Sequence, residues 1–512
     1  MSAHLAVTAG AATLFPGVPV HRVDDLTADP PADVEVLVTV GDEVVDTRGA
    51  LRRWRRAGVE VVAIDPTRGP TLGRGPHAAT VELGAADALL PAVDPLVANP
   101  VLWRRRAKVP HGTLLHRPTP AAAAAAAALG DVDADDWHLL VPDDLTGAAR
   151  REVLGERRAA TVRDTADLVD RAKRVRVLLQ DPAWDADARR ALAGVVAALA
   201  AGTPVVTTAD HPAARAGLPV VVAEDPRDLR AAAAHLVDDE DERERVSVAA
   251  RRTVLQQHTG AARLAALRAR LGLVDRGHVP RVSVLLATNR PEHVAHAVRS
   301  VATQDHPDVE LVLLLHGDAP QPPAELDRFP GPVQVVRVPQ ERVLGEVLNA
   351  GLDVATGDLV AKMDDDDLYG RHHLGDLVLA LGYSGADLVG RRIEHVYLRG
   401  RDVTVTRARS NVERDRDHVS GPTLLLPTDV ARRYRFLPLP RRVDSTLLER
   451  LREDDRRVYG THALDVVLHR HGAHTWDADE DAWLEDAELV TDGLDLARTA
   501  STPDSYRAVW DT

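Results

Sequence analysis

The sequence predicts an α/β protein built from two successive series of strands and helices. In the first half, short β-branched runs such as VEVLVTVG (34–41) and VRVLLQDP (175–182) alternate with helical stretches rich in Ala, Arg and Leu. A second series begins with VSVLLA (282–287), after the glycines and proline of LGLVDRGHVP (271–280). Strands that alternate with helices of about 10 to 15 residues are typical of βαβ units and parallel sheets.

A chain of 512 residues is too long for one hydrophobic core. We expect a Rossmann-like domain over residues 1–275 and a second α/β domain with a mixed central sheet over residues 280–490. Residues 491–512 have weak periodicity and are expected to form a peripheral C-terminal tail.

Composition excludes several classes of protein. The net charge of -15 and the pI near 5.8 argue against a nucleic-acid surface as the main partner. With no cysteine, the chain has neither disulfides nor thiolate metal ligands, which fits a reducing compartment. MSAHLAVTAGAATLF (1–15) lacks a basic n-region, and no apolar run approaches the roughly 18 residues of a membrane span. The expected location is cytoplasmic.

The segment AKMDDDDLYG (361–370) places four aspartates in a row after an apolar strand-like run. Two carboxylates about 4 Å apart repel by roughly 4 kcal/mol at an effective dielectric near 20, so a partly buried cluster needs a cation or hydrogen-bond donors. Because residues i and i+2 of an extended chain face the same side, Asp364 and Asp366 are expected to bind one cation together. Mg²⁺ and Mn²⁺ prefer such oxygen ligands.

Two other interpretations of the aspartates were weighed. An EF-hand loop that starts at Asp364 would need glycine at its sixth position and glutamate at its twelfth, but these are Tyr369 and Gly375. The alternative that stays open is an acidic first turn, favoured by the dipole of the following helix HHLGDLVLAL (372–381).

Polar residues also follow the first strand of the second series. Thr288, Asn289 and Arg290 stand at its carboxyl end, where open α/β sheets bind ligands, although such a segment can be only a turn. Asp444 stands at the front of an amphipathic helix in PRRVDSTLLERLRE (440–453), where it is a candidate catalytic residue or a helix N-cap.

Two segments rich in cationic or titratable residues have weaker signals. His469, His471 and His474 lie close together in sequence. They could form a metal cluster or belong to a solvated surface loop. The Arg-rich segment 391–417 could contact acceptor phosphates or an anionic membrane, but its interspersed acids favour an ordinary solvated edge.

Taken in order, these segments resemble the family 2 glycosyltransferases of the GT-A fold. The resemblance covers about residues 281–476. The segments that carry it are VSVLLATNRPEHVAHAVRSVATQDHPDVELVLLLHG (282–317), LGEVLNAGLDVATGDLVAKMDDDDLYGRHHL (344–374) and VDSTLLERL (443–451).

This resemblance implies roles for individual residues. Asp364 and Asp366 would hold Mn²⁺ or Mg²⁺ on the diphosphate of a nucleotide-sugar, with His469 or His474 completing the metal site. Asp444 would be the general base that acts on the acceptor hydroxyl. The residues placed at the donor are Thr288, Asn289, Arg290, Asp318, Asn349, Asp364 and Asp365.

The chain departs from the family pattern at two positions. The family's second strand usually ends in paired aspartates, one of which reads the nucleobase, whereas this chain has His316, Gly317 and Asp318. The identity of the donor nucleobase is therefore open. Val443 replaces the glutamate that often precedes the general base.

The first half resembles the carboxyl-terminal half of GT-B glycosyltransferases, particularly spore-coat glycosyltransferase-like proteins, over residues 198–267. Ala197 occupies the position of the glutamate that binds the donor ribose in that family. The resemblance therefore implies a degenerate, non-catalytic domain.

The expected function is that of a metal-dependent inverting glycosyltransferase of the hexosyltransferase type. It would move a sugar from a nucleotide-diphosphate donor to a hydroxyl of a glycan, a cell-surface polymer or a small-molecule glycoside. A nucleotidyltransferase is the first alternative, although ATNRPEH (287–293) has no glycine-rich phosphate loop. A non-catalytic carbohydrate-binding scaffold is the second.

Overall fold

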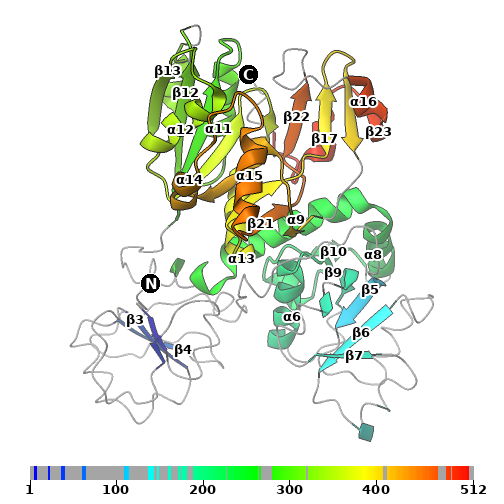
Figure 1. Cartoon of the computed structure of the whole chain (residues 1–512). Helices are drawn as coiled ribbons and strands as arrows, with labels where there is room; N and C mark the ends of the chain where they lie inside the picture. The colour runs from blue at the N-terminus through cyan, green and yellow to red at the C-terminus, as the bar shows by residue number, and fades with distance from the viewer. Residues whose placement is uncertain are drawn as a thin grey trace. The chain divides into compact units, whose positions relative to one another are not determined.

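The computed structural model describes several long stretches of the chain and a number of short ones (Figure 1). The described residues are 5–7, 21–22, 36–40, 60–64, 109–114, 137–142, 147–148, 151, 159–162, 171–172, 174–180, 188–225, 228–262, 265–266, 279–318, 321–407, 412–470, 480–485 and 487–506. All structural statements below concern these residues.

The chain divides into two compact units, which we describe separately. The first comprises Met1–Ala98, Lys108–Arg243 and Ala250–His278. The second comprises Asn99–Ala107, Glu244–Ala249 and Val279–Thr512.

The first unit contains two sheets in which every described strand pair is parallel. The smaller sheet has the order β2-β1-β3-β4 and the larger the order β10-β9-β8-β5-β6-β7. This all-parallel arrangement confirms the expected Rossmann-like α/β class. The strands are β1 (Leu5–Val7), β2 (His21–Arg22), β3 (Val36–Val40), β4 (Glu60–Ile64), β5 (Val109–Leu114), β6 (Trp137–Pro142), β7 (Ala159–Val162), β8 (Val175–Leu179), β9 (Val205–Thr208) and β10 (Val221–Ala223). The helices are α6 (Ala188–Ala200), α7 (Pro212–Arg215), α8 (Leu229–Asp238) and α9 (Glu240–Gln257).

The second unit is built on a mixed sheet of eight strands, as expected, in the order β13-β12-β11-β14-β20-β16-β21-β19. Strands β13, β12, β11 and β14 run parallel, and β20 pairs antiparallel with β14. These strands are β11 (Val282–Thr288), β12 (Val309–His316), β13 (Val333–Val338), β14 (Leu359–Asp364), β16 (Leu388–Arg391), β19 (Arg414–Asp415), β20 (Leu425–Pro427) and β21 (Val458–Thr461).

A smaller five-stranded sheet of the same unit has the order β15-β22-β17-β18-β23. Its strands are β15 (Leu368–Tyr369), β17 (His395–Leu398), β18 (Val403–Arg407), β22 (Val466–Arg470) and β23 (Ala487–Asp492). The helical segments of the unit are α11 (Val294–Ala302), η6 (Ala324–Arg328), α12 (Leu344–Val354), α13 (His373–Ser384), η7 (Gly421–Thr423), α14 (Thr428–Tyr434), α15 (Val443–Glu453), α16 (Glu480–Glu485) and α17 (Leu496–Thr499).

The core of the second unit explains why these segments form strands. Nearly every residue of β11 and β12 is buried, because a central parallel strand is covered on both faces. Leu285 and Leu314 of the sheet share one apolar cluster with Leu348 of α12 and Leu447 of α15. Residues far apart in sequence are therefore fixed around one edge of the sheet. None of the helices in the described part of the chain has the length and hydrophobicity that a bilayer span requires.

The segment expected to be a peripheral tail is packed against the unit as far as residue 506. Strand β23 pairs antiparallel with β18. Thr499 and Ser505 are buried, and the Ser505 carbonyl accepts a hydrogen bond from the Arg371 N–H at 2.8 Å. After β23, short turns and polar contacts hold this part of the chain as far as residue 506. The expected bounds of the C-terminal tail stay a prediction.

A buried carboxylate ties the central strands together. Glu310 at the start of β12 is 0% exposed and accepts hydrogen bonds from the Thr356 N–H at 2.8 Å and the Thr356 hydroxyl at 2.9 Å. It also accepts from the Ser283 hydroxyl, which in turn accepts from the Gly357 N–H at 2.8 Å. This network joins β11, β12 and the turn that leads into β14.

We expect Glu310→Ala to lower the free energy of unfolding by about 3 kcal/mol, because it leaves buried donors without an acceptor. Urea unfolding followed by circular dichroism would measure the change. Glu325→Ala is the matched control, since Glu325 pairs with Arg299 where both side chains are about one-third exposed, and such pairs contribute about 1 kcal/mol or less. Equal effects of the two substitutions would contradict the stabilising role of the buried Glu310 network.

Candidate active site

The carboxyl ends of three parallel strands bring the candidate site together. Register pairs Thr288 at the end of β11 with Leu315 of β12, and Ala287 with Asp364 of β14. Because parallel strands end at the same edge of a sheet, the segments that follow β11, β12 and β14 lie side by side. This edge is where open α/β sheets bind their ligands.

Arg290 holds two of the four aspartates. Its guanidinium donates to both oxygens of Asp365 and lies 2.9 Å from Asp366 Oδ2. The Thr288 hydroxyl donates to Asp365 Oδ2 at 2.5 Å. Burial disfavours the charged guanidinium, but the two carboxylates outweigh this effect and raise the pKa of Arg290. Burial also raises the pKa of Asp365, a shift that the bonds from Arg290 and Thr288 oppose.

Lys362 is the second cation of the site. Its ammonium lies 2.7 Å from Asp364 Oδ1 and 3.3 Å from Asp444 Oδ2, and the residue is only 5% exposed. Burial disfavours its charge, but the attraction of Asp364 and Asp444 prevails and raises the pKa of Lys362. Lys362 therefore links the aspartate cluster to the candidate general base.

The chain bends at residues 365–367, directly after β14. Asp364 therefore turns to Lys362, whereas Asp366 turns to Arg290. Strand β14 ends at Asp364, so the chain is not extended from Asp364 to Asp366. The expected binding of one cation by these two carboxylates stays a prediction.

Asp367 is the most buried member of the cluster, at 2% exposed. Its Oδ1 accepts a hydrogen bond from the His469 backbone N–H at 3.1 Å, while its Oδ2 is buried and has no hydrogen-bond partner in the structure. Burial, together with the charges of Asp366 and Asp364, raises the pKa of Asp367 well above its usual range. The Tyr369 hydroxyl accepts from the Asp364 N–H and donates to the Pro422 carbonyl, which fixes the ends of the bend.

Asp444 lies in the first turn of α15. Its Oδ2 contacts Lys362, and its Oδ1 is buried without a hydrogen-bond partner. A Cβ atom at Gly421 would lie 2.1 Å from Asp444 Oδ2, so only glycine leaves room for the carboxylate. Burial raises the pKa of Asp444, and the attraction of Lys362 partly offsets this shift.

Two residues of α12 position the chain that leads to α15. The Asn349 side chain donates to the Phe436 carbonyl at 2.7 Å and accepts from the Phe436 N–H at 3.0 Å. A Cβ at Gly345 would lie 1.8 Å from the Leu437 carbonyl, so this close approach requires glycine. In this structure Asn349 thus supports the segment before Asp444, and its role at the donor stays a prediction.

The remaining predicted residues lie around the same edge or outside the described residues. Asn289 and Asp318 are exposed, after β11 and β12 respectively. The His469 ring lies beside Tyr397 of β17, 5.5 Å between ring centroids, and the His469 backbone N–H donates to Asp367. His474, like His471, lies outside the described residues. Their assignments stay predictions.

Sequence reasoning missed Lys362 and Gly421. Lys362 precedes Asp364 by two positions on the same strand, so its side chain leaves the same face. The chain contains only three lysines, and one of them stands beside four aspartates. This pairing was a signal for a charge partner. The need for glycine at position 421 had no local signal, because it comes from Asp444 in a distant helix.

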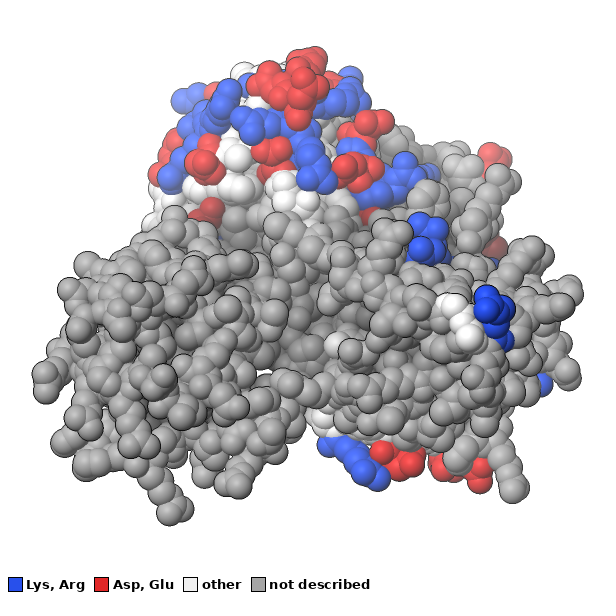
Figure 2. All heavy atoms as spheres, turned by 90° about the horizontal axis from the view of Figure 1, so that it is seen from below, with Lys and Arg blue, Asp and Glu red and all other residues white. Residues whose placement is uncertain are grey.

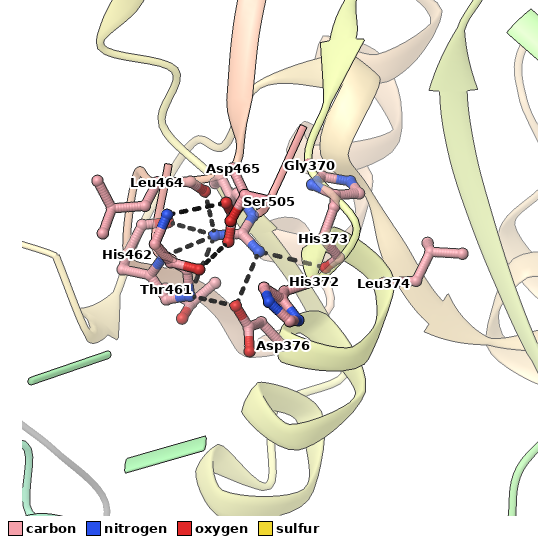
Figure 3. A network of polar contacts seen from close by, with 12 residues as sticks. Gly370, His372, His373, Leu374, Asp376, Thr461, His462, Leu464, Asp465 and Ser505 are labelled. Carbon is pink, nitrogen blue, oxygen red and sulfur yellow. Dashed lines mark hydrogen bonds and ion pairs between the residues drawn. The ribbon is translucent and has the colours of Figure 1, made fainter. Parts of the chain in front are cut away.

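A buried polar network connects the start of α13 with the chain between β21 and β22 (Figure 3). Arg391, expected on a solvated edge, is 0% exposed. It donates to the carbonyls of His462 at 3.1 Å, Leu464 at 2.7 Å and His373 at 3.2 Å, and the His462 ring contacts Asp376 at 2.9 Å. This network fixes the chain that enters β22, the strand that pairs with β15 directly after the aspartates.

Within the described residues, no three His, Asp or Glu side chains already converge as a metal site. The available donors nevertheless fit a divalent ion. Lys362 contacts only one oxygen of Asp364, whose side chain is 38% exposed, and the buried Oδ2 of Asp367 has no partner. Carboxylate oxygens are the ligands that Mg²⁺ and Mn²⁺ prefer.

Comparison with known protein families identifies the class. Residues 284–436 match the family model described as glycosyl transferase family 2, and residues 164–269 match the one described as glycosyl transferase-like. The chain therefore carries a family 2 glycosyltransferase domain in its C-terminal half and a glycosyltransferase-like segment before it. Both resemblances drawn from the sequence are confirmed.

Individual relatives are similar over part of the chain. An uncharacterized glycosyltransferase of Nostoc sp. is 27% identical over 132 residues, which cover 25% of this chain and 40% of that protein. The succinoglycan biosynthesis protein ExoO of Rhizobium meliloti is 28% identical over 127 residues, or 24% of this chain and 36% of that protein. The chain thus spans well under two thirds of the length of these relatives.

The similar solved structures have lower sequence identity. The S. aureus TarS 1-349 structure in complex with UDP-GlcNAc is 18% identical, with 41% of this chain and 68% of that chain covered and a TM-score of 0.31. The mannosyltransferase PcManGT from Pyrobaculum calidifontis, in complex with GDP-Man and Mn²⁺, is 18% identical, with 44% and 67% covered and a TM-score of 0.29.

We expect Lys362→Met to lower the free energy of unfolding by about 2 kcal/mol, because it leaves two partly buried carboxylates without their cation. Chemical denaturation would measure the change. Arg342→Met is the matched control, since Arg342 pairs with Glu346 where its side chain is 59% exposed, and we expect it to cost under about 0.5 kcal/mol. An unchanged stability of Lys362→Met would show that the buried contacts do not form.

Proposed function

We propose that the second unit is a metal-dependent inverting glycosyltransferase that moves a hexose-type sugar from a nucleotide-diphosphate donor to an acceptor hydroxyl. The observation that carries this proposal is the link from Asp364 through Lys362 to Asp444, at the ligand-binding edge of a domain that matches glycosyl transferase family 2. The Lys362 ammonium thus contacts both a candidate donor-binding carboxylate, Asp364, and the candidate general base, Asp444.

Asp444 is the proposed general base. Its Oδ2 is held by Lys362, which leaves the unpartnered Oδ1 to accept the proton of the acceptor hydroxyl. As that proton moves, the acceptor oxygen attacks the anomeric carbon from the face opposite the leaving diphosphate, which inverts the configuration. Such base catalysis contributes typically 10²- to 10⁴-fold.

Asp364 and Asp366 are the proposed metal ligands. A bound Mg²⁺ or Mn²⁺ would neutralise the negative charge that develops on the leaving diphosphate. Arg290 holds Asp366 in place, and Lys362 does the same for Asp364. Of the proposed donor-contacting residues, Thr288 ends β11, Asn289 follows it, and Asp318 follows β12.

We propose that the first unit does not catalyse transfer. Ala197, at the position expected for a ribose-binding glutamate, is 1% exposed within α6 and offers no polar group. Acceptor binding or assembly is its proposed role.

Asp366→Asn should reduce transfer by at least about 100-fold, because it weakens binding of the metal that supports the leaving group. Excess chelator should abolish the activity of the unsubstituted protein, and added Mn²⁺ should restore it. Release of nucleoside diphosphate from a panel of nucleotide-sugars measures both effects. Asp308→Asn, at the opposite end of the sheet and paired with Arg281, is the control. Full activity in excess chelator would rule out metal dependence.

Asp444→Asn should lower kcat by about 10²- to 10⁴-fold while the donor Kd changes less than about twofold, because the base acts on the acceptor and not on the donor. Single-turnover kinetics and calorimetry with the donor and Mn²⁺ separate the two quantities. Glu449→Gln on the same helix, where Glu449 pairs with Arg442, is the control. Loss of donor affinity with unchanged kcat would mean that Asp444 has another role.

A further inference from the structure

We infer that the acceptor of this enzyme is anionic, with a phosphate or carboxylate group that binds the arginine cluster formed by Arg392, Arg414 and Arg416 beside the candidate base. This inference rests on the proposed function, because it names the class of molecule that approaches Asp444. It is carried by three arginines that lie in one part of the fold without acidic partners in the described structure.

The cluster is connected to Asp444 by one continuous segment, residues 412–421. Arg414 of β19 pairs with Gly460 of the neighbouring strand β21. The Arg416 N–H continues this pairing by donating to the Val458 carbonyl at 2.8 Å. The segment ends at Gly421, whose backbone packs directly against the Asp444 carboxylate.

Arg392 directly follows β16 and belongs to the same cluster. The Arg391 carbonyl accepts from the Ser420 N–H at 2.7 Å, and the Ile393 N–H donates to the Ser420 hydroxyl at 3.0 Å. These two bonds fix Arg392 beside the residue that precedes Gly421. Arg392 is exposed, so its guanidinium is accessible from solvent.

Side chains of an extended chain alternate between its two sides, and this alternation separates the charges of residues 414–416. Arg414 and Arg416 leave one side, and Asp415 between them leaves the other, where it pairs with Arg457 at 2.9 Å. Arg416 is half-buried, and its Nη2 has no hydrogen-bond partner in the structure. A buried donor without an acceptor is costly, so a ligand oxygen at this position would stabilise the site.

The charges of the cluster act on one another. Burial and the neighbouring Arg414 and Arg392 lower the pKa of Arg416, with Glu394 opposing the shift. Burial also lowers the pKa of His418, an effect that Asp444 opposes and Arg392 reinforces. The arginines are therefore near enough to repel each other, and Arg392 acts on the same imidazole as the candidate base.

Several other arginines of this unit have acidic partners. On the face shown in Figure 2, basic and acidic side chains of the described residues are interspersed. Elsewhere in the described part of this unit, arginines such as Arg401 and Arg435 pair with acids. Near the cluster, Asp417 is exposed but pairs with no arginine in the described structure, and Glu394 is buried at 2% exposed.

Arginine favours phosphate and carboxylate ligands because its planar guanidinium donates two parallel hydrogen bonds to them. An acceptor that bears such a group close to its reacting hydroxyl would be held by the arginines while that hydroxyl reaches Asp444. A neutral acceptor would leave the arginines to water and to mutual repulsion.

The test uses the full chain with Mn²⁺, a donor chosen by metal-dependent hydrolysis, and acceptors offered in matched neutral and charged forms. Glucose, glucose 6-phosphate and glucuronate form one such set, and phosphorylated and neutral oligosaccharides form others. We expect kcat/KM for a charged acceptor to exceed that of its neutral form by at least about tenfold, a difference that corresponds to one charge-assisted hydrogen bond. Calorimetry with the same compounds measures their binding without turnover.

The double variant Arg392→Gln/Arg416→Gln should raise KM for the charged acceptor about tenfold and leave donor hydrolysis and kcat unchanged. Arg392→Gln alone, at an exposed position, should raise KM for the charged acceptor by a smaller factor. This single variant keeps the test informative if the double variant misfolds. The control Arg281→Gln/Arg452→Gln removes the same net charge elsewhere and should leave KM unchanged.

The possible outcomes separate the inference from the proposed function. Equal use of neutral and charged acceptors, or failure of every charged probe to bind, would overturn the inference while donor hydrolysis continued. Loss of acceptor selectivity in the control would also overturn it, because general charge would then explain the effect. Absence of metal-dependent donor hydrolysis would instead overturn the proposed function, with binding of charged probes still deciding the inference.

Discussion

Neutralisation of four consecutive carboxylates is the constraint on which the second unit depends. Arg290 from the end of β11 and Lys362 from within β14 supply the two cations, and the His469 N–H supplies a further donor. Each partner comes from a different element, so the sheet, the bend and β22 must all be in place before the cluster is stable. The charges that suit a ligand site thus also determine its local structure.

The fold class could be predicted because it depends on local patterns. Apolar β-branched runs separated by helical stretches identify parallel strands directly, and the run LGEVLNAGLDVATGDLVAKMDDDD (344–367) carries a family signal in consecutive residues. The packing of residues 493–506 could not be predicted, because it depends on polar contacts with distant residues such as Asp465, whose carboxylate accepts from the Ser501 N–H at 3.0 Å. Such contacts leave no periodic pattern.

Prediction of the site was correspondingly uneven. The aspartates, Arg290 and Asp444 stand out as charged residues at the ends of predicted elements. Gly421 does not, because its close approach to the Asp444 carboxylate involves a helix that is distant in sequence. Asn349 was expected to contact the donor. In this structure its side-chain nitrogen and oxygen both hydrogen-bond to the backbone of Phe436, a contact that the sequence does not reveal.

The packing of residues 496–506 has a consequence for synthesis of the protein. Ser505 and Thr502 contact Arg371 and His372, which follow the aspartates by only a few positions. During translation these contacts can form only after more than 100 further residues have been added, since the contacting pairs are separated by that distance along the chain. A nascent chain therefore carries the start of α13 without these contacts until this segment has emerged from the ribosome.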